Sequence, residues 1–178
     1  MLVSGVDDGY FPLKYKGRKG KTVLMSVVFD NYEIVDIDFD FIYVDGEEAG
    51  DVLRTLKKGE ISILDGVTFG GFNYVNPFEL DFKYIIFYSS KPNLKRVSEA
   101  LSKHFNDSRK DVILNVMNNL TRLTTKRGDI YVYSNIETKE VVEVIEKYQV
   151  FDKLPEPLKT AHELSSSLSR FLLSKNLI

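Results

Sequence analysis

The chain has 178 residues, of which 43% are hydrophobic and 28% are charged, as in an ordinary globular protein. No apolar stretch approaches the roughly 20 residues of a membrane helix, and the first residues do not predict a signal peptide. The lack of cysteine excludes disulfides and thiolate metal sites, and two histidines make a histidine-based zinc site a poor fit. We expect one cytoplasmic domain over residues 1–178, with no membrane partner and with any metal held by oxygen.

The net charge of −2 provides no overall attraction for nucleic acid, so such a partner would need a local basic patch. The candidate is the basic turn, defined here as residues 14–21, which carries Lys14, Lys16, Arg18, Lys19 and Lys21. The alternative is a solvated hairpin tip, because charged side chains are common on exposed loops. The sequence indicates no particular oligomeric state.

Strands are predicted in the first half of the chain. Residues 3–11 and 22–30 are apolar and β-branched and flank the basic turn, which predicts a hairpin. Residues 34–44 alternate apolar side chains with aspartates, as in a strand with one solvated face. Residues 47–58 carry apolar side chains at helical spacing and predict a helix.

Two short apolar runs follow, at residues 61–64 and 84–88, and they predict buried parallel strands. Between them, residues 66–77 combine glycines with aromatic side chains. This glycine–aromatic loop has the backbone freedom and the flat surfaces to admit a ligand, or it folds beneath its own aromatic rings.

Helices and strands alternate in the remainder of the chain. The spacing of apolar residues predicts helices at 93–105, 110–123 and 138–148, a strand at 129–134, and a last amphipathic helix beginning near Pro157. The predicted architecture is an α/β fold with a mixed central sheet, three antiparallel strands followed by parallel strands, and helices on both faces.

Three apolar runs end at Asp-Gly, namely at Asp8-Gly9, Asp45-Gly46 and Asp65-Gly66. Asp-Gly commonly begins a tight turn, because glycine accepts positive φ and aspartate caps the backbone. Carboxylates gathered at strand ends also bind divalent cations, which offset the cost of burying their charge. Spacing alone leaves both explanations open, although Asp45 is best explained as the turn into the following helix.

A three-stranded meander, a helix and a parallel strand ending in Asp is the order of elements in the ribonuclease H-like fold, where the first and fourth strands are neighbours. This order places Asp7 beside Asp65, with Glu48 at the helix start as a third carboxylate. Such a triad would bind Mg²⁺ or Mn²⁺ and hydrolyse a phosphodiester. Asp8 is expected to face the opposite side of its strand.

Three longer motifs resemble one family. GVDDG at residues 5–9, LDGVTFGGFN at residues 64–73 and LPEPLKTAH at residues 154–162 are similar to the signatures of the archaeal family catalogued as domain of unknown function 99, the UPF0215 type. The resemblance covers nearly the whole chain. That family is in turn similar to endonuclease V, a metal-dependent nuclease that cleaves near deaminated adenine in DNA or RNA.

The resemblance implies site residues. Asp7 and Asp65 match the two metal-binding aspartates of endonuclease V, Glu48 lies near the place of its third acid, and Lys91 resembles a lysine that steadies a phosphate. Two departures affect function. The Tyr-Ile-Pro-Gly wedge of endonuclease V is absent, and residues 68–73 replace its His-Pro-Arg stretch, which bears on both lesion recognition and cleavage.

The predicted nucleic-acid surface comprises Phe69, Gly70, Phe72, Lys14, Lys16 and Arg18. Phe69 and Phe72 would stack on a base, worth about 1–3 kcal/mol per base, unless they pack within the loop. Lys91 is equally well explained as a surface lysine, and His162 as a packed or hydrogen-bonded histidine. The predicted function is metal-dependent phosphodiester hydrolysis on DNA or RNA, and the alternative is a non-catalytic module that binds nucleic acid or protein.

Overall fold

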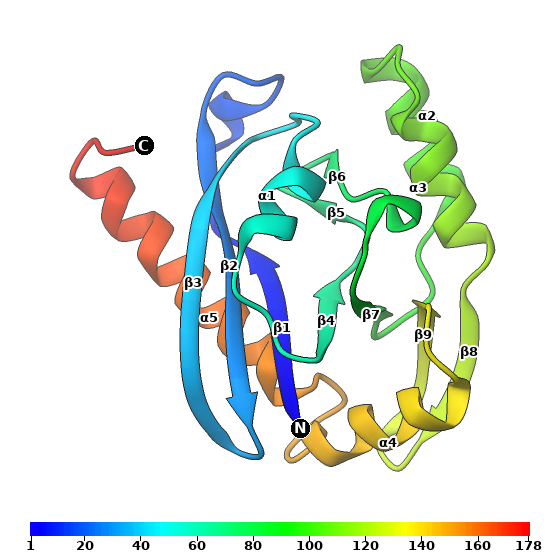
Figure 1. The fold of residues 1–178 in the computed structure, drawn as a ribbon. Helices are drawn as coiled ribbons and strands as arrows, with labels where there is room; N and C mark the ends of the chain where they lie inside the picture. The colour runs from blue at the N-terminus through cyan, green and yellow to red at the C-terminus, as the bar shows by residue number, and fades with distance from the viewer.

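The computed structural model describes residues 1–178 and has a seven-stranded mixed sheet in the order β3-β2-β1-β4-β7-β9-β8 (Figure 1). The strands are β1 (Leu2–Asp8), β2 (Lys21–Asp30), β3 (Glu33–Tyr43), β4 (Ile61–Asp65), β7 (Lys83–Tyr88), β8 (Thr121–Thr125) and β9 (Gly128–Ser134). The first three form the predicted antiparallel meander, while β4 runs parallel to β1, and β7 to β4. The predicted α/β class and mixed sheet are confirmed.

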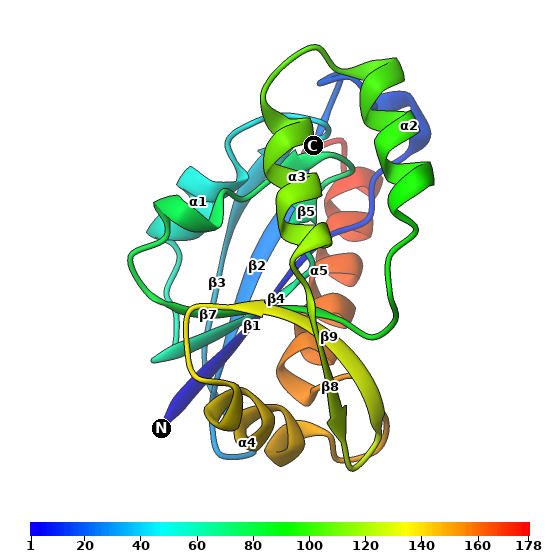
Figure 2. The ribbon, with the colours of Figure 1, turned by 90° about the vertical axis from the view of Figure 1, so that its right-hand side faces the viewer.

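Helices cover both faces of the sheet (Figures 1 and 2). One core lies under α4 (Thr138–Tyr148) and α5 (Glu156–Ser174), and the other under α1 (Ala49–Thr55), α2 (Leu94–His104) and α3 (Arg109–Asn118). Neighbouring residues of β4 serve different cores, because side chains alternate along a strand: Ile63 faces the first core and Leu64 the second. None of the helices has the length and hydrophobicity of a membrane span.

Short elements gather beyond the carboxyl ends of β1 and β4, the upper end in Figure 1. The basic turn includes the 3₁₀ helix η1 (Leu13–Tyr15). The glycine–aromatic loop contains a small ribbon of β5 (Thr68–Phe69) and β6 (Asn73–Tyr74), and the 3₁₀ helix η2 (Pro77–Glu79) follows it. The loops at this end of the sheet therefore come from distant parts of the sequence.

The prediction of a helix over residues 110–123 is wrong at its end. Helix α3 stops at Asn118, and Thr121–Thr125 forms strand β8, which pairs antiparallel with β9. The threonines of this segment are β-branched and favour a strand, and Gly128 takes the positive φ of 113° at the end of the hairpin turn. The pairing partner, rather than the local apolar spacing, decides the structure here.

Candidate metal and nucleic-acid site

The ends of β1 and β4 bring two aspartates side by side. The two strands pair in parallel from Val3 opposite Ile61 to Val6 opposite Leu64, so the next positions in the register are Asp7 and Asp65. Both side chains lie on the face covered by α5, because they follow Val3 and Ile61 at even spacing. The structure therefore places the two predicted ligands as neighbours, 58 residues apart in sequence.

A glycine within β1 and another directly after it allow α5 to approach this site. A Cβ atom on Gly5 would lie 2.1 Å from the carbonyl group of Pro157, in the first turn of α5, and one on Gly9 would lie 2.7 Å from Oγ of Ser169. This close packing sets His162 on α5 beside β1, where its Nδ1 is 2.8 Å from Oδ2 of Asp7. Residues 5–9 and 154–162 thus form one structural unit.

Asp8 belongs to the same charged cluster, because its carboxyl lies close enough to that of Asp7 to raise the pKa of Asp7. Its Oδ2 accepts a hydrogen bond from the backbone N–H of Gly70, in the glycine–aromatic loop. Its carbonyl oxygen accepts a hydrogen bond from the hydroxyl of Ser165 on α5 at 2.6 Å. Asp8 therefore connects the end of β1 to both the loop and the helix.

Burial makes the charges of these carboxylates costly. Desolvation, with the nearby charges of Asp65 and Asp8, raises the pKa of Asp7 to about 9. Desolvation and then Asp8 raise the pKa of Asp65 to about 6, while His162 opposes the shift. Burial also raises the pKa of Asp8, against the hydrogen bond from Gly70. No hydrogen bond from the chain stabilises the carboxylate of Asp65, and His162 is the one cationic side chain that lowers its pKa.

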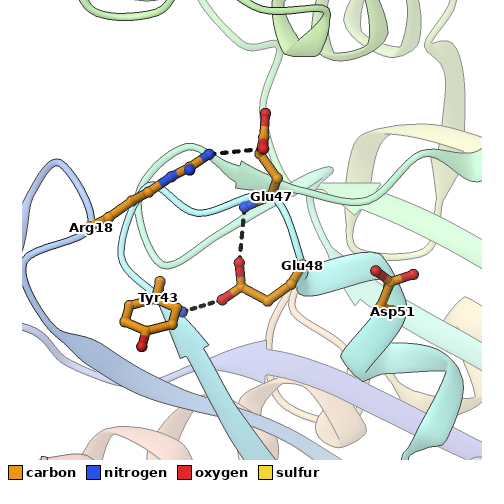
Figure 3. Close-up of a pocket in the computed structure, with 5 residues that line it drawn as sticks. All are labelled: Arg18, Tyr43, Glu47, Glu48 and Asp51. Carbon is orange, nitrogen blue, oxygen red and sulfur yellow. Dashed lines mark hydrogen bonds and ion pairs between the residues drawn. The ribbon is translucent and has the colours of Figure 1, made fainter.

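Glu48, the expected third ligand, is held elsewhere. Its carboxylate accepts hydrogen bonds from the backbone N–H groups of Tyr43 and, at 2.9 Å, Glu47 (Figure 3). It lines an open cavity of about 560 Å³ with Arg18, Tyr43, Glu47 and Asp51. No three acidic or histidine side chains stand together in metal-ligating geometry. The structure brings together Asp7 and Asp65, but not Glu48, because both of its oxygens serve the backbone of its own turn.

Lys91 likewise lies apart from the aspartates. It is exposed and lines a cavity of about 410 Å³ with residues of α2, α3, β8 and β9. It forms no ion pair within the chain, in keeping with the alternative of a surface lysine.

The basic turn is partly anchored and partly free. Oδ2 of Asp45 accepts a hydrogen bond from the backbone N–H of Gly17 at 2.9 Å, and Arg18 pairs with Glu47 at 2.9 Å. Lys14 and Lys16 are exposed and have no carboxylate partner, although Lys14 lies 5.9 Å from the ring centre of Tyr15. Arg18 is therefore committed to the protein, and the lysines present the available charge.

The predicted aromatic surface needs a correction. Phe69 is 1% exposed and packs in the core beneath α1, so a base cannot stack on it. The positive φ of 58° at Gly70 turns the chain there, and the following Phe72 is half-buried against Phe105, with ring centres 5.6 Å apart. Loop packing explains Phe69, and only Phe72 reaches an open cavity.

Arg109 is a site residue that the sequence did not reveal. It is 1% exposed, and its guanidinium donates hydrogen bonds to the carbonyl oxygens of Asp45 at 3.1 Å and Phe72 at 2.9 Å. Its Nε pairs with Asp107 at 2.9 Å, which holds the pKa of that carboxyl below its usual range. The buried cation joins segments far apart in sequence, a role that no local pattern marks.

Comparison with known proteins identifies the family. The family model described as Endonuclease dU matches residues 1–169. The chain belongs to the Endonuclease dU family. Its relatives include the UPF0215 protein of Sulfurisphaera tokodaii, 64% identical over 178 residues with 100% of each chain covered. The UPF0215 protein of Thermococcus sibiricus is 31% identical, with 93% of this chain and 91% of the relative covered. The resemblance drawn from the three motifs is confirmed.

Several solved structures have a fold similar to that of this Endonuclease dU family member. A protein of unknown function from Archaeoglobus fulgidus has a TM-score of 0.77 at 21% identity, covering 94% of this chain and 97% of that one. Endonuclease V of Ciona intestinalis, in complex with DNA containing an inosine, has a TM-score of 0.54 at 14% identity. The match covers 98% of this chain and 86% of that one. The chain therefore has the ribonuclease H-like fold of endonuclease V, as predicted.

Proposed function

We propose that this protein is a divalent-metal-dependent endonuclease that cleaves a phosphodiester bond in DNA. The observation that carries the proposal is the pair Asp7 and Asp65 at the ends of two adjacent parallel strands. Both carboxyls are buried enough to raise their pKa, and Asp65 has no donor of its own. Buried acids with unmet charge at a strand end are typical of a cation site.

The donor set fits Mg²⁺ or Mn²⁺. Asp7 and Asp65 would supply two carboxylate ligands, and water with substrate phosphate oxygens would complete the shell, as is usual for Mg²⁺. When bound, the metal would activate water and stabilise charge on the departing oxygen. Glu48 would join this set only by leaving the backbone N–H groups of Tyr43 and Glu47, so we assign it to the turn.

His162 and Asp8 position the two ligands in this proposal. His162 contacts Oδ2 of Asp7. The other oxygen, Oδ1, accepts a hydrogen bond from the backbone N–H of Asp8. The side chain of His162 is 63% exposed, so its ring borders solvent next to the carboxylate of Asp7. Asp8 holds Gly70, and with it the glycine–aromatic loop, against the end of β1.

The family description suggests the substrate. Endonuclease dU refers to deoxyuridine, and the related endonuclease V structures hold DNA with an inosine, so both names point to deaminated bases. Residues 68–73 occupy the place of the missing His-Pro-Arg stretch, and we assign base recognition to this loop. DNA containing deoxyuridine is thus the first substrate to test, and inosine-containing DNA or RNA the second.

A cleavage assay tests the proposal. Labelled single-stranded and duplex DNA containing deoxyuridine, inosine or neither, and matching RNA, are incubated with Mg²⁺, Mn²⁺ or EDTA. Wild type should cut a deaminated strand only with metal, and Asp65→Asn should lower the rate at least 1,000-fold, since a metal ligand is lost. The control Asp51→Asn changes an exposed acid on α1 and should cut normally. No cleavage of any substrate by wild type, or equal cleavage by Asp65→Asn, would contradict the proposal and favour the non-catalytic module.

A further inference from the structure

A second cavity lies between the basic turn and the end of α2. It has a volume of about 350 Å³, and its wall includes Lys16, Lys19, Asp45, Phe72, His104 and Phe105. These residues come from four separate segments: the basic turn, the turn before α1, the glycine–aromatic loop and the end of α2. The cavity is separate from the Glu48 cavity shown in Figure 3, which shares none of its lining residues.

The free charge of this cavity is positive. Lys16 and Lys19 are exposed and have no acidic partner within the chain. The one acid in the wall, Asp45, is 7% exposed, and its carboxylate already accepts hydrogen bonds from the backbone N–H groups of Gly17 and Phe72. The nearby Asp107 is paired with Arg109. The ammonium groups are therefore available to an anion, in spite of the net negative charge of the protein.

The aromatic wall is fixed before any ligand arrives. Phe72 and Phe105 contact each other at an interplanar angle of 72°, and the guanidinium of Arg109 lies 4.0 Å from the ring centre of Phe105. Arg109 also binds the carbonyl oxygen of Phe72. A ligand would not have to order these side chains, which lowers the entropic cost of binding.

The cavity begins close to the aspartates. Gly70 donates its N–H to Asp8 at the end of β1, and Phe72 follows two residues later, a span of at most about 7 Å along the chain. The loop that carries Phe72 into this cavity is therefore joined directly to the end of the strand that carries Asp7 and Asp8.

We propose that the cavity binds a nucleotide next to the cleaved one, with its phosphate on Lys16 and Lys19 and its base against Phe72. The inference rests on the proposed function, because it takes a nucleic-acid strand as the ligand. A nucleotide offers both an anion and a flat apolar face at this scale, which matches a wall of two lysines and an aromatic ring. An acidic peptide would use the lysines but not the ring.

Binding of a fluorescein-labelled 12-residue oligothymidylate in EDTA separates this inference from catalysis. Fluorescence anisotropy over a salt series is measured for wild type and for Lys16→Ala/Lys19→Ala. Loss of two phosphate contacts should weaken binding at least 10-fold at low salt and reduce the salt slope by about 1.4. The control Lys83→Ala/Lys139→Ala removes two lysines that pair with Glu140 and Glu143, and it should bind within 2-fold of wild type.

Phe72 distinguishes a nucleotide from a simple anion. Phe72→Ala should weaken binding about 10-fold with an unchanged salt slope, because stacking carries no charge. Phe72→Leu keeps most of the side-chain volume and should show the same loss if the ring itself contacts the base, with an unchanged melting temperature as the check on folding. Poly-glutamate should compete poorly. Unchanged affinity in the lysine and Leu variants, or equal competition by poly-glutamate, would overturn the inference.

The two proposals can fail separately. If wild type cuts a deaminated strand and Asp65→Asn does not, but the lysine variant binds normally, the nucleotide cavity is overturned and the endonuclease stands. If nothing is cut but binding falls as expected in the cavity variants, the endonuclease is overturned and the cavity stands as part of a nucleic-acid-binding module.

Discussion

Asp45-Gly46 and Asp65-Gly66 share a dipeptide but differ in what surrounds the carboxylate. At Asp45, φ is 59°, the residue is 7% exposed, and the two carboxylate oxygens accept hydrogen bonds from Phe72 and Gly17, each at 2.9 Å. At Asp65, the carboxylate ends a buried strand beside Asp7, and no group of the chain donates to it.

The difference shows how a structural aspartate is told from a functional one. The turn explanation of Asp-Gly holds at Asp45, and the metal site is what we propose for Asp65. A carboxylate that satisfies the backbone of its own turns is part of the fold, whereas one left with raised pKa and no donor is available to an external cation. The hydrogen bonds that each carboxylate accepts, and not the dipeptide, decide its role.

The largest effect on stability is expected at Arg109, the buried cation that binds the backbone at Asp45 and Phe72. Arg109→Met should lower the free energy of unfolding by about 3–5 kcal/mol, since Asp107 and two carbonyl oxygens lose their partner. Urea denaturation measures the loss. Arg122→Met is the control, because Arg122 is 66% exposed in its pair with Asp129 and should leave the stability nearly unchanged, as is usual for a surface ion pair. Equal losses in the two variants would contradict the assigned role of Arg109.

Removal of each aspartate in turn tests the contrast directly. Asp45→Ala leaves the N–H groups of Gly17 and Phe72 without their acceptor and should cost about 2–3 kcal/mol. In EDTA at pH 7, Asp65→Asn should instead raise the free energy of unfolding by about 3 kcal/mol, because a buried charge with a pKa raised by about two units is removed. A destabilised Asp65→Asn protein would show that Asp65 is structural.

The pH dependence of metal-free stability follows from the same shifts. Asp7 and Asp65 hold their protons more tightly in the folded chain, with pKa values of about 9 and about 6 against 3.8. The contribution of these two groups to the free energy of unfolding is therefore full below about pH 4. It is lost between about pH 4 and 6 for Asp65 and between about pH 4 and 9 for Asp7. The free energy of unfolding of Asp65→Asn should rise relative to wild type between pH 4 and 6, and the difference should stay constant above pH 6. A difference that is constant with pH would refute the shift.

The smallest effect is expected at His162, which contacts one ligand rather than the metal. His162→Ala should weaken Mn²⁺ binding only about 10-fold, the lower limit for groups that orient a metal ligand, and His162→Gln should recover part of the loss through its side-chain amide. Isothermal titration with Mn²⁺ provides the comparison. A loss as large as that of Asp65→Asn would make His162 a direct ligand.

Much of the fold could be predicted because it depends on local patterns. The alternation in β3, the apolar runs of β4 and β7, and the order of the elements specify the sheet, and the parallel register then brings Asp7 to Asp65. Strand β8 was missed because its pairing with β9 outweighs helical spacing over residues 110–123.

Parts of the candidate site could not be predicted from the sequence. Glu48 and Phe69 are decided by which backbone donors and which core lie nearby in three dimensions, and no spacing encodes that. Arg109 acts on Asp45 and Phe72 across 64 and 37 residues. His162 reaches Asp7 only because Gly5 and Gly9 admit α5, although both motifs were visible in the sequence.

Anomalous diffraction from crystals grown with Mn²⁺ tests the central claim most directly, because it locates the cation without reference to activity. We expect one Mn²⁺ peak with carboxylate oxygens of both Asp7 and Asp65 at about 2.0–2.6 Å, and no peak at that place in the Asp65→Asn protein. A peak at Glu47, Glu48 and Asp51 instead, or none at the ends of β1 and β4, would contradict the account.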